Sequence, residues 1–191
     1  MSYITTFSGK HFDPVNPETE SIDIQDIAHA LPLICRGNGH VKTFFSVGQH
    51  CIKAAKEAAL RGFSTRVILA CLLHDAGECY MSDVPRPFKQ ALPSYIEAED
   101  RLLDLVYEKF LGSTLTEEEA QQVKSIDNDL LYYDLKILLN EVLDIPAPVL
   151  QIDQNYDFVP FELVTQEYLA LYEKYFNELH LISQEDIHEK N

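Results

Sequence analysis

Histidine and carboxylate side chains follow directly after the most apolar segment of the chain. The segment VILACLL, residues 67–73, leads into His74 and Asp75, and two more carboxylates follow at Glu78 and Asp83. Burying ionised side chains is costly unless they are paired or bind a metal ion. The grouping therefore indicates a polar site at the edge of the core, either a metal centre or a set of hydrogen-bonded core residues.

Four side chains are candidate ligands of one divalent metal ion. His74 and Asp75 are adjacent, and His50 belongs to the preceding predicted helix, which packs against theirs if the short connection makes an antiparallel pair. Asp127 shares a helical face with four leucines that follow it by three to eleven positions. Two imidazoles and two carboxylates suit Mn, Co, Fe, Zn or Mg. No histidine lies between Asp75 and Asp127, which favours one tightly held ion over a His-bridged pair of ions.

No segment beyond residue 20 has the sequence pattern of a β-strand, so we expect helices to bring these side chains together. Apolar spacing predicts helices over about 23–35, 47–60 and 66–80, and then 94–111, 116–144 and 161–180. Capping boxes at Ser46–Gln49, Ser94–Glu97 and Thr116–Glu119 open three of them. Residues 3–20 contain turn signals and predict a turn or a short hairpin. We expect an all-α fold, with residues 1–191 forming a single domain.

The distribution of acidic and basic residues along the chain limits the classes of binding partner that we expect. Residues 1–96 hold nine acids and nine bases, so residues 97–191 carry the whole net charge of −16. Nucleic-acid binding depends on basic clusters, so we expect no nucleic-acid partner, whereas a small phosphate ester needs only a few local cations. The chain shows no signal peptide or membrane-length apolar run, and its four cysteines show no metal-binding spacing. These features predict a cytoplasmic protein with reduced thiols and no membrane contact.

The order of these residues resembles the HD-domain metal-dependent phosphohydrolases. The resemblance runs from about 26 to 136 and is carried by RGNGHVKTFFSVGQH, HDAGECYMSDVPRPFK and VKSID. It is strongest to the bacterial 5'-deoxynucleotidase branch and to phage relatives that hydrolyse deoxynucleoside triphosphates. It implies a bundle of roughly five or more helices around one metal ion, and leaves a homodimer open. The family's ligands fall on His50, His74, Asp75 and Asp127.

The resemblance also assigns catalytic and substrate-binding roles. The acid/base carboxylates fall on Glu78 and Asp83, and the phosphate-orienting arginine falls on Arg36, whose planar guanidinium can hold phosphate oxygens. Gly37, which follows Arg36, opens a Gly-x-Gly loop that would let the substrate approach. The substrate-contacting turn falls on residues 83–86, and the expected substrate contacts are Arg36, Gly37, Asp83, Val84, Pro85, Arg86 and Lys89.

Two assignments stay open at this point. Glu78 is our choice for aligning or deprotonating the attacking water, and Asp83 for the leaving group or a substrate hydroxyl, but the reverse is equally compatible with the sequence. The nucleotidases carry an aromatic residue after the arginine where this chain has Gly37, and Phe44 or Phe45 is expected to replace it beside the base.

The leading hypothesis is a phosphohydrolase that removes the 5'-phosphate of deoxynucleoside monophosphates. A deoxynucleoside triphosphate triphosphohydrolase is the rival within the same class. A non-catalytic HD module that binds a nucleotide as a sensor is the alternative of another class. A purely structural bundle would explain the apolar core but not the acids directed toward it.

Overall fold

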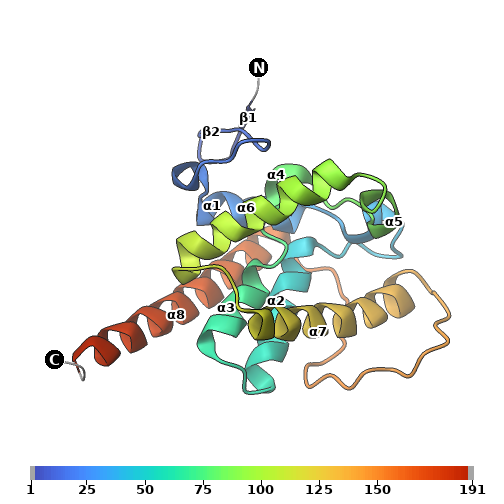
Figure 1. The fold of residues 1–191 in the computed structure, drawn as a ribbon. Coiled ribbons are helices and arrows are strands. Elements are labelled where there is room, and N and C mark those ends of the chain that lie inside the picture. The colour runs from blue at the N-terminus through green and yellow to red at the C-terminus, as the bar shows by residue number, and fades with distance from the viewer. Residues whose placement is uncertain (1–2, 189–191) are drawn as a thin grey trace.

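The computed structural model describes residues 3–188, with side chains up to residue 181, and it is mostly helical (Figure 1). An antiparallel hairpin of β1 (Ile4–Thr5) and β2 (His11–Phe12) stands at the N-terminus. The α-helices are α1 (Ile24–Ala30), α2 (Val47–Leu60), α3 (Thr65–Leu73), α4 (Glu78–Met81), α5 (Arg86–Lys89), α6 (Pro93–Leu111), α7 (Glu117–Tyr133) and α8 (Phe161–His188). Short 3-10 turns cover Thr19–Ser21, Leu31–Leu33 and Arg36–Gly39, and a π turn covers Asp134–Leu138. The predominantly helical class and the N-terminal hairpin are confirmed.

Helices α2 and α3 lie at the centre of the bundle and begin where the sequence predicts (Figure 1). Ser46 and Gln49 form the expected capping box at the start of α2, and the Ser64 side chain accepts a hydrogen bond from the backbone of Val67 in α3. Every residue of α3 from Val67 to Leu73 is buried. This helix contacts α2, α6, α7 and α8, as its nearly all-round apolar character requires.

Helix α3 ends at Leu73, so the predicted continuous helix over 66–80 is wrong. The backbone carbonyls at its end are satisfied from outside the helix: Nδ1 of His74 lies 2.7 Å from the Cys71 oxygen, and the Tyr168 hydroxyl donates to the Leu72 oxygen at 2.8 Å. Side-chain partners of this kind replace the next helical turn. His74 and Glu78 therefore lie on either side of a helix break, and not on one face of a regular helix as the sequence predicted.

The boundaries of α6 and α7 differ from the predicted ones in two places. Helix α6 begins with Pro93 at its first turn and has no side-chain cap, so the expected capping box at Ser94 is wrong. The Thr116–Glu119 capping box of α7 is confirmed. The regular part of α7 ends at Tyr133 and a π turn follows, so the helix does not run to residue 144.

The last helix is longer than predicted and contributes to the core. Helix α8 runs to His188 rather than to about 180, and it packs against α1, α2 and α3. Tyr168 from this helix is fully buried. Among the residues that the structure describes, none of the helices combines the length and the apolar character that a membrane span requires.

The connecting segment 140–160, between the π turn and α8, has no helix or strand and is held by a buried acid of α2. Glu57 is fully buried, and its carboxylate accepts hydrogen bonds from the backbone of Gln151 and Ile152 and from Nε of Arg61. These donors satisfy both carboxylate oxygens. The attachment places the segment along α2, on whose first turn His50 lies.

We expect Glu57→Gln to lower the free energy of unfolding by about 2 kcal/mol, because an amide NH₂ cannot accept from a backbone N–H and charge-assisted hydrogen bonds are lost. Urea unfolding followed by circular dichroism measures the change. The exposed Glu118→Gln in α7 is the matched control and should shift stability by less than about 0.5 kcal/mol. Equal stabilities of the two variants would contradict the anchoring role of Glu57.

Candidate metal centre

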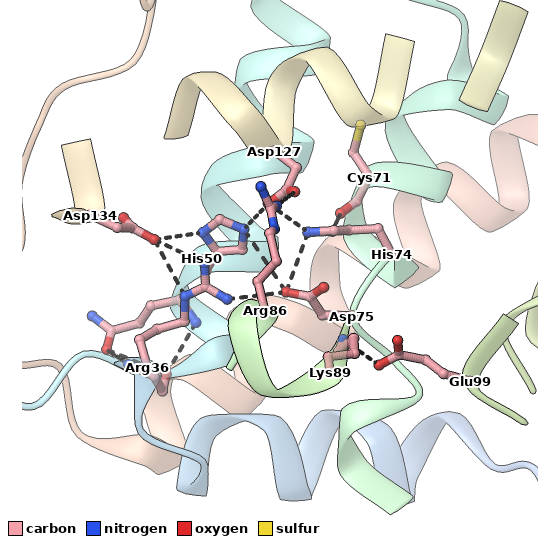
Figure 2. Close-up of polar contacts among 12 residues, drawn as sticks. Arg36, His50, Cys71, His74, Asp75, Arg86, Lys89, Glu99, Asp127 and Asp134 are labelled. Carbon is pink, nitrogen blue, oxygen red and sulfur yellow. Dashed lines mark hydrogen bonds and ion pairs between the residues drawn. The ribbon is translucent and has the colours of Figure 1, made fainter. Parts of the chain in front are cut away.

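Four side chains from three parts of the chain converge at one end of α2 and α3 (Figure 2). Nε2 of His50 lies 3.1 Å from Oδ1 of Asp127 and 3.9 Å from Oδ2 of Asp75. Nε2 of His74 lies 3.4 Å from the same Asp75 oxygen and 3.7 Å from the same Asp127 oxygen. Each imidazole thus faces both carboxylates, as the sequence-based ligand set requires.

The local fold explains how each donor reaches this point. His50 is in the first turn of α2, and His74 and Asp75 begin the turn after α3, where the chain leaves the helix. Asp127 projects from the middle of α7, which packs against both α2 and α3. The helix break at Leu73 therefore places His74 and Asp75 at the edge of the core and keeps them partly accessible.

The donor set fits a divalent ion. Ligand atoms about 2.0–2.2 Å from one ion lie roughly 3–4 Å from each other, which is the range of the four separations given above. His50, His74 and Asp75 each offer a ligand atom within 4.8 Å of the others. Nε2 of His74 is buried with no hydrogen-bond partner, while Nδ1 is taken by the Cys71 carbonyl. An unpartnered ring nitrogen that faces two carboxylates is a group suited to binding a cation.

The electrostatics of the cluster also favour a cation. Burial alone would lower the pKa of His74, but Asp75 and Asp127 outweigh it and raise the pKa well above its ordinary value. Burial likewise opposes protonation of His50, and its contacts with Asp127 and Asp134 raise its pKa. The carboxylates therefore draw positive charge to the imidazoles, and protons and a metal ion compete for the same nitrogens.

Asp134 is a site residue that sequence reasoning missed. Its carboxylate is 5% exposed, and Oδ2 lies 3.1 Å from Nδ1 of His50 and 3.1 Å from Nη2 of Arg36. Burial by itself raises the pKa of Asp134, but contacts with His50 and Arg36 lower it to about 2. The signal in the sequence was its position seven residues after Asp127, on the same apolar helical face.

Arg36 is held between two acids at the wall of the site. Its Nη1 lies 3.4 Å from Oδ2 of Asp75, its Nε and Nη2 contact Asp134, and 13% of its side chain is exposed. It precedes a turn in which Gly37 and Asn38 have positive φ angles of 58° and 52°. The turn bends the chain so that Arg36 points to the carboxylates, and its remaining N–H groups are available for an anion.

Glu78 is buried beside the candidate ligands, and its backbone N–H donates to the backbone oxygen of Asp75 at 3.0 Å. It is 6% exposed, and its Oε2 has no hydrogen-bond partner. Burial is the main cause that raises its pKa well above the ordinary value, with further contributions from the negative charges of Asp75 and Asp83. A carboxyl group in this setting exchanges a proton more readily near neutral pH than an exposed one does.

A cavity of about 570 Å³ joins the remaining predicted residues to the cluster. Asp75, Glu78, Asp127 and Asp134 line it, and so do Arg36, Gly37, Asp83, Val84, Pro85, Arg86 and Lys89. The structure thus brings the whole predicted substrate set to one cavity, with two of the four predicted ligands on its wall. The size is typical of small-molecule sites.

The two cations at the cavity mouth differ in how firmly they are held. Lys89 forms an ion pair with Glu99 at 2.7 Å, and its side chain is 24% exposed. Arg86 is 59% exposed and lies 3.8 Å from Oδ2 of Asp127. Arg86 and Lys89 belong to a short helix, α5, rather than to a simple turn. Arg86 is thus the more exposed of the two cations, and its ion pair is longer than that of Lys89, so it contributes less rigid charge to the cavity.

The apolar wall of the cavity is aliphatic, so the expected replacement of an aromatic residue by Phe44 or Phe45 is wrong. Phe45 is buried in a separate apolar cluster with Leu138 and Tyr156, and Phe44 packs edge-on against Phe158. The wall beside Gly37 is built from Val41, Leu131, Leu135, Leu138 and Leu139. Leu131 belongs to α7, and Leu135 and Leu138 belong to the π turn. These three leucines are among those that the sequence places on the same face as Asp127.

Loading chelator-treated protein with Mn²⁺, Co²⁺ or Zn²⁺ is expected to raise its melting temperature. An ion at about one hundred times its Kd stabilises the fold by about 2.7 kcal/mol, which corresponds to roughly 5–10 °C for a protein of this size. Differential scanning calorimetry measures the shift. Ca²⁺ prefers all-oxygen sites and should have little effect. No shift with any of the three transition metals would contradict a metal centre here.

Comparisons with known proteins identify relatives but no described family. No family model matches the chain. It is similar to the uncharacterized protein YfdR of Escherichia coli K12, with 39% identity over 112 residues, which is 58% of this chain and 59% of the relative. It is also similar to the uncharacterized protein RCAP_rcc00048 of Rhodobacter capsulatus, with 34% identity over 126 residues, 63% of this chain and 64% of the relative. The chain thus spans about six tenths of the length of these curated relatives, and their names assign no activity.

Proposed function

We propose that this protein is an HD-type metal-dependent phosphohydrolase that removes the 5'-phosphate of deoxynucleoside monophosphates. The observation that carries the proposal is the convergence of His50 and His74 on the same two carboxylates, Asp75 and Asp127, at the wall of a cavity. Glu78 is the buried carboxyl group beside them. This combination is what hydrolysis of a phosphate ester requires: ligands for a cation, a proton-transfer group and room for a small substrate.

His50, His74, Asp75 and Asp127 would hold one divalent ion. When bound, such an ion supplies Lewis acidity that offsets phosphate charge and acidifies water. Arg36 contributes a planar pair of N–H groups to the phosphate oxygens from the same wall. Arg86 of α5 also lines the cavity and can supply a second guanidinium group to the phosphate.

Glu78 and Asp83 would divide the proton transfers. Glu78 is buried near Asp75, so we assign it to positioning the attacking water and accepting its proton. A raised pKa brings a carboxylate closer to the pH of use, which improves it as a general base. Asp83 is partly exposed at the cavity wall, and we assign it to the leaving 5'-oxygen or to a sugar hydroxyl.

The charge of the cavity favours a monophosphate over a triphosphate. Five carboxylates line it, at 75, 78, 83, 127 and 134, against three permanent cations, Arg36, Arg86 and Lys89. One divalent ion brings the formal charge to zero. A monophosphate then adds about two negative charges and a triphosphate about four, for which the lining offers no further arginine or lysine. The triphosphohydrolase reaction would need a second cation carried in with the substrate.

The aliphatic wall suits the nucleoside part of the substrate. Leu131, Leu135 and Leu139 offer an apolar surface without hydrogen-bonding groups, so it can bury any base but cannot distinguish bases by polar contacts. We therefore expect modest base preference. The rate should fall strongly when the nucleoside is replaced by a small polar alcohol, as in ribose 5-phosphate.

The test is hydrolysis by the metal-free protein after reloading with Mn²⁺, Co²⁺ or Mg²⁺. Deoxynucleoside mono- and triphosphates are supplied separately, and the products are separated by ion-exchange chromatography. Release of inorganic phosphate from monophosphates is the expected result. Tripolyphosphate from triphosphates would replace the proposal with its rival, and binding without product would identify a sensor module.

A further inference from the structure

We propose that Asp134 and Tyr156 position His50 for metal binding, so that the connecting segment 140–160 forms an outer layer of the metal centre. The inference rests on the metal centre of the proposed function. It does not require that the centre hydrolyse a phosphate ester. Neither residue is among the expected ligands or proton-transfer groups.

Asp134 contacts the side of the His50 ring that faces away from the other donors (Figure 2). Its Oδ2 is 3.1 Å from Nδ1, while Nε2 of the same ring faces Asp75 and Asp127. Nδ1 forms no hydrogen bond with any residue that the structure describes, so the contact is electrostatic. A carboxylate beside Nδ1 favours the proton on that nitrogen and leaves the lone pair of Nε2 for the ion. His74 has a related arrangement, in which Nδ1 is hydrogen-bonded to the Cys71 carbonyl oxygen at 2.7 Å. The two imidazoles are thus oriented by one charged and one neutral oxygen.

Tyr156 fixes the other oxygen of Asp134. Its hydroxyl donates to Oδ1 at 2.9 Å, and the residue is 7% exposed. A carboxylate that receives a hydrogen bond on Oδ1 and contacts His50 and Arg36 through Oδ2 has little freedom to rotate. Asp134 continues the helical backbone of α7, because its N–H still bonds to the Leu130 carbonyl, and its position seven residues after Asp127 places both acids on one face.

The ring of Tyr156 is held between α2 and a phenylalanine. Nζ of Lys53, one turn after His50, lies 3.5 Å from the ring centroid, and the ring of Phe45 packs at 4.8 Å. A cation over the ring face withdraws electron density, which strengthens the hydroxyl as a donor. Lys53, Tyr156 and Asp134 therefore form a chain of contacts that leads from the outer side of α2 to the metal-ligating histidine.

Other contacts also hold the connecting segment 140–160 in place. They allow an experiment to distinguish positioning of His50 from simple attachment of the segment. The Tyr133 hydroxyl donates to the Pro148 oxygen at 2.7 Å, and Glu57 binds the backbone of Gln151 and Ile152. These contacts hold the same segment without reaching His50 or Asp134. Tyr133→Phe is thus a matched control for Tyr156→Phe, since each removes one phenolic hydrogen bond of the segment.

The experiment measures Co²⁺ affinity of the full chain by chelator competition, together with the visible absorption spectrum of the bound Co²⁺. We expect about tenfold weaker binding for Tyr156→Phe and about 10- to 100-fold weaker binding for Asp134→Asn, with a changed spectrum in both. Tyr133→Phe should stay within about twofold of the unaltered protein and keep its spectrum. Far-UV circular dichroism checks that all three variants are folded.

Three outcomes would overturn the inference. One is unaltered Co²⁺ affinity and spectrum in Tyr156→Phe. Another is an equal loss in Tyr156→Phe and Tyr133→Phe, which would indicate general loosening of the segment. The third is an unaltered protein that binds no Co²⁺. A protein that binds Co²⁺ with the expected ranking of variants but hydrolyses no nucleotide would uphold the positioning role while refuting the proposed reaction.

Discussion

Asp75→Ala is expected to abolish both metal retention and turnover. Asp75 contributes an oxygen that lies within 4 Å of Nε2 of both imidazoles, and the same oxygen contacts Arg36. Removing it leaves two histidines and one carboxylate around the ion and releases Arg36 from one of its two acidic partners. We expect at least a 100-fold loss of metal affinity, since a direct ligand should matter more than the outer partners that cost 10- to 100-fold.

Metal analysis of the purified variant by inductively coupled plasma mass spectrometry, followed by the nucleotidase assay, measures both effects. Asp129→Ala is the matched control, because Asp129 is a partly buried, ion-paired acid on the same helix as Asp127 but binds Arg61 instead. The control should keep its metal and its activity. Stoichiometric metal in Asp75→Ala would show that the ion is held elsewhere.

Glu78→Gln is expected to keep the metal and lose turnover by about 10²- to 10⁴-fold, the usual contribution of a general acid or base. The side chain is not within the set of four donors, and the amide has nearly the same shape. Stability should be unchanged or slightly higher, because the variant buries a neutral amide in place of a carboxyl group with an unpartnered oxygen. Loss of turnover with full metal content would distinguish the Glu78 variant from the Asp75 variant, which is expected to lose both.

Steady-state kinetics with saturating Mn²⁺, alongside metal analysis, provides the measurement. Exposed Glu97→Gln in α6 is the control for the same substitution and should retain full activity. Asp83→Asn distinguishes the two proton-transfer roles: if Asp83 serves the leaving group, its loss should matter less for substrates with a good leaving group such as p-nitrophenyl phosphate. Full activity of Glu78→Gln would remove Glu78 from the mechanism.

The parts of the fold that sequence predicts well are those set by neighbouring residues. The Ser46–Gln49 and Thr116–Glu119 capping boxes and the buried helix after Ser64 are local, because each depends on side chains within one or two turns. The predicted helix ends were less accurate. The end of α3 depends on Tyr168, almost one hundred positions away, whose hydroxyl satisfies the Leu72 carbonyl.

The candidate site likewise contains residues that local sequence pattern identifies and residues that only distant contacts identify. Residue types and spacing, together with the resemblance to the HD-domain phosphohydrolases, selected His50, His74, Asp75 and Asp127 and the neighbouring Glu78, because buried acids and histidines must be paired or bind a metal ion. Asp134 and Tyr156 escaped selection because the side chains that they contact are far away in the sequence. The expected aromatic neighbour of Gly37 failed for the same reason, since the direction of Phe45 depends on packing with Tyr156.

By itself, the sequence determined the helical class, the residue types of the candidate donor groups and the acidic net charge of the chain, because these follow from composition and short-range pattern. Only the tertiary structure decided that the donors face one another across a helix break, that Arg36 lies between two acids, and that the cavity wall is aliphatic. Those features depend on which distant side chains share a volume of a few ångströms, and that is set by packing of the whole chain.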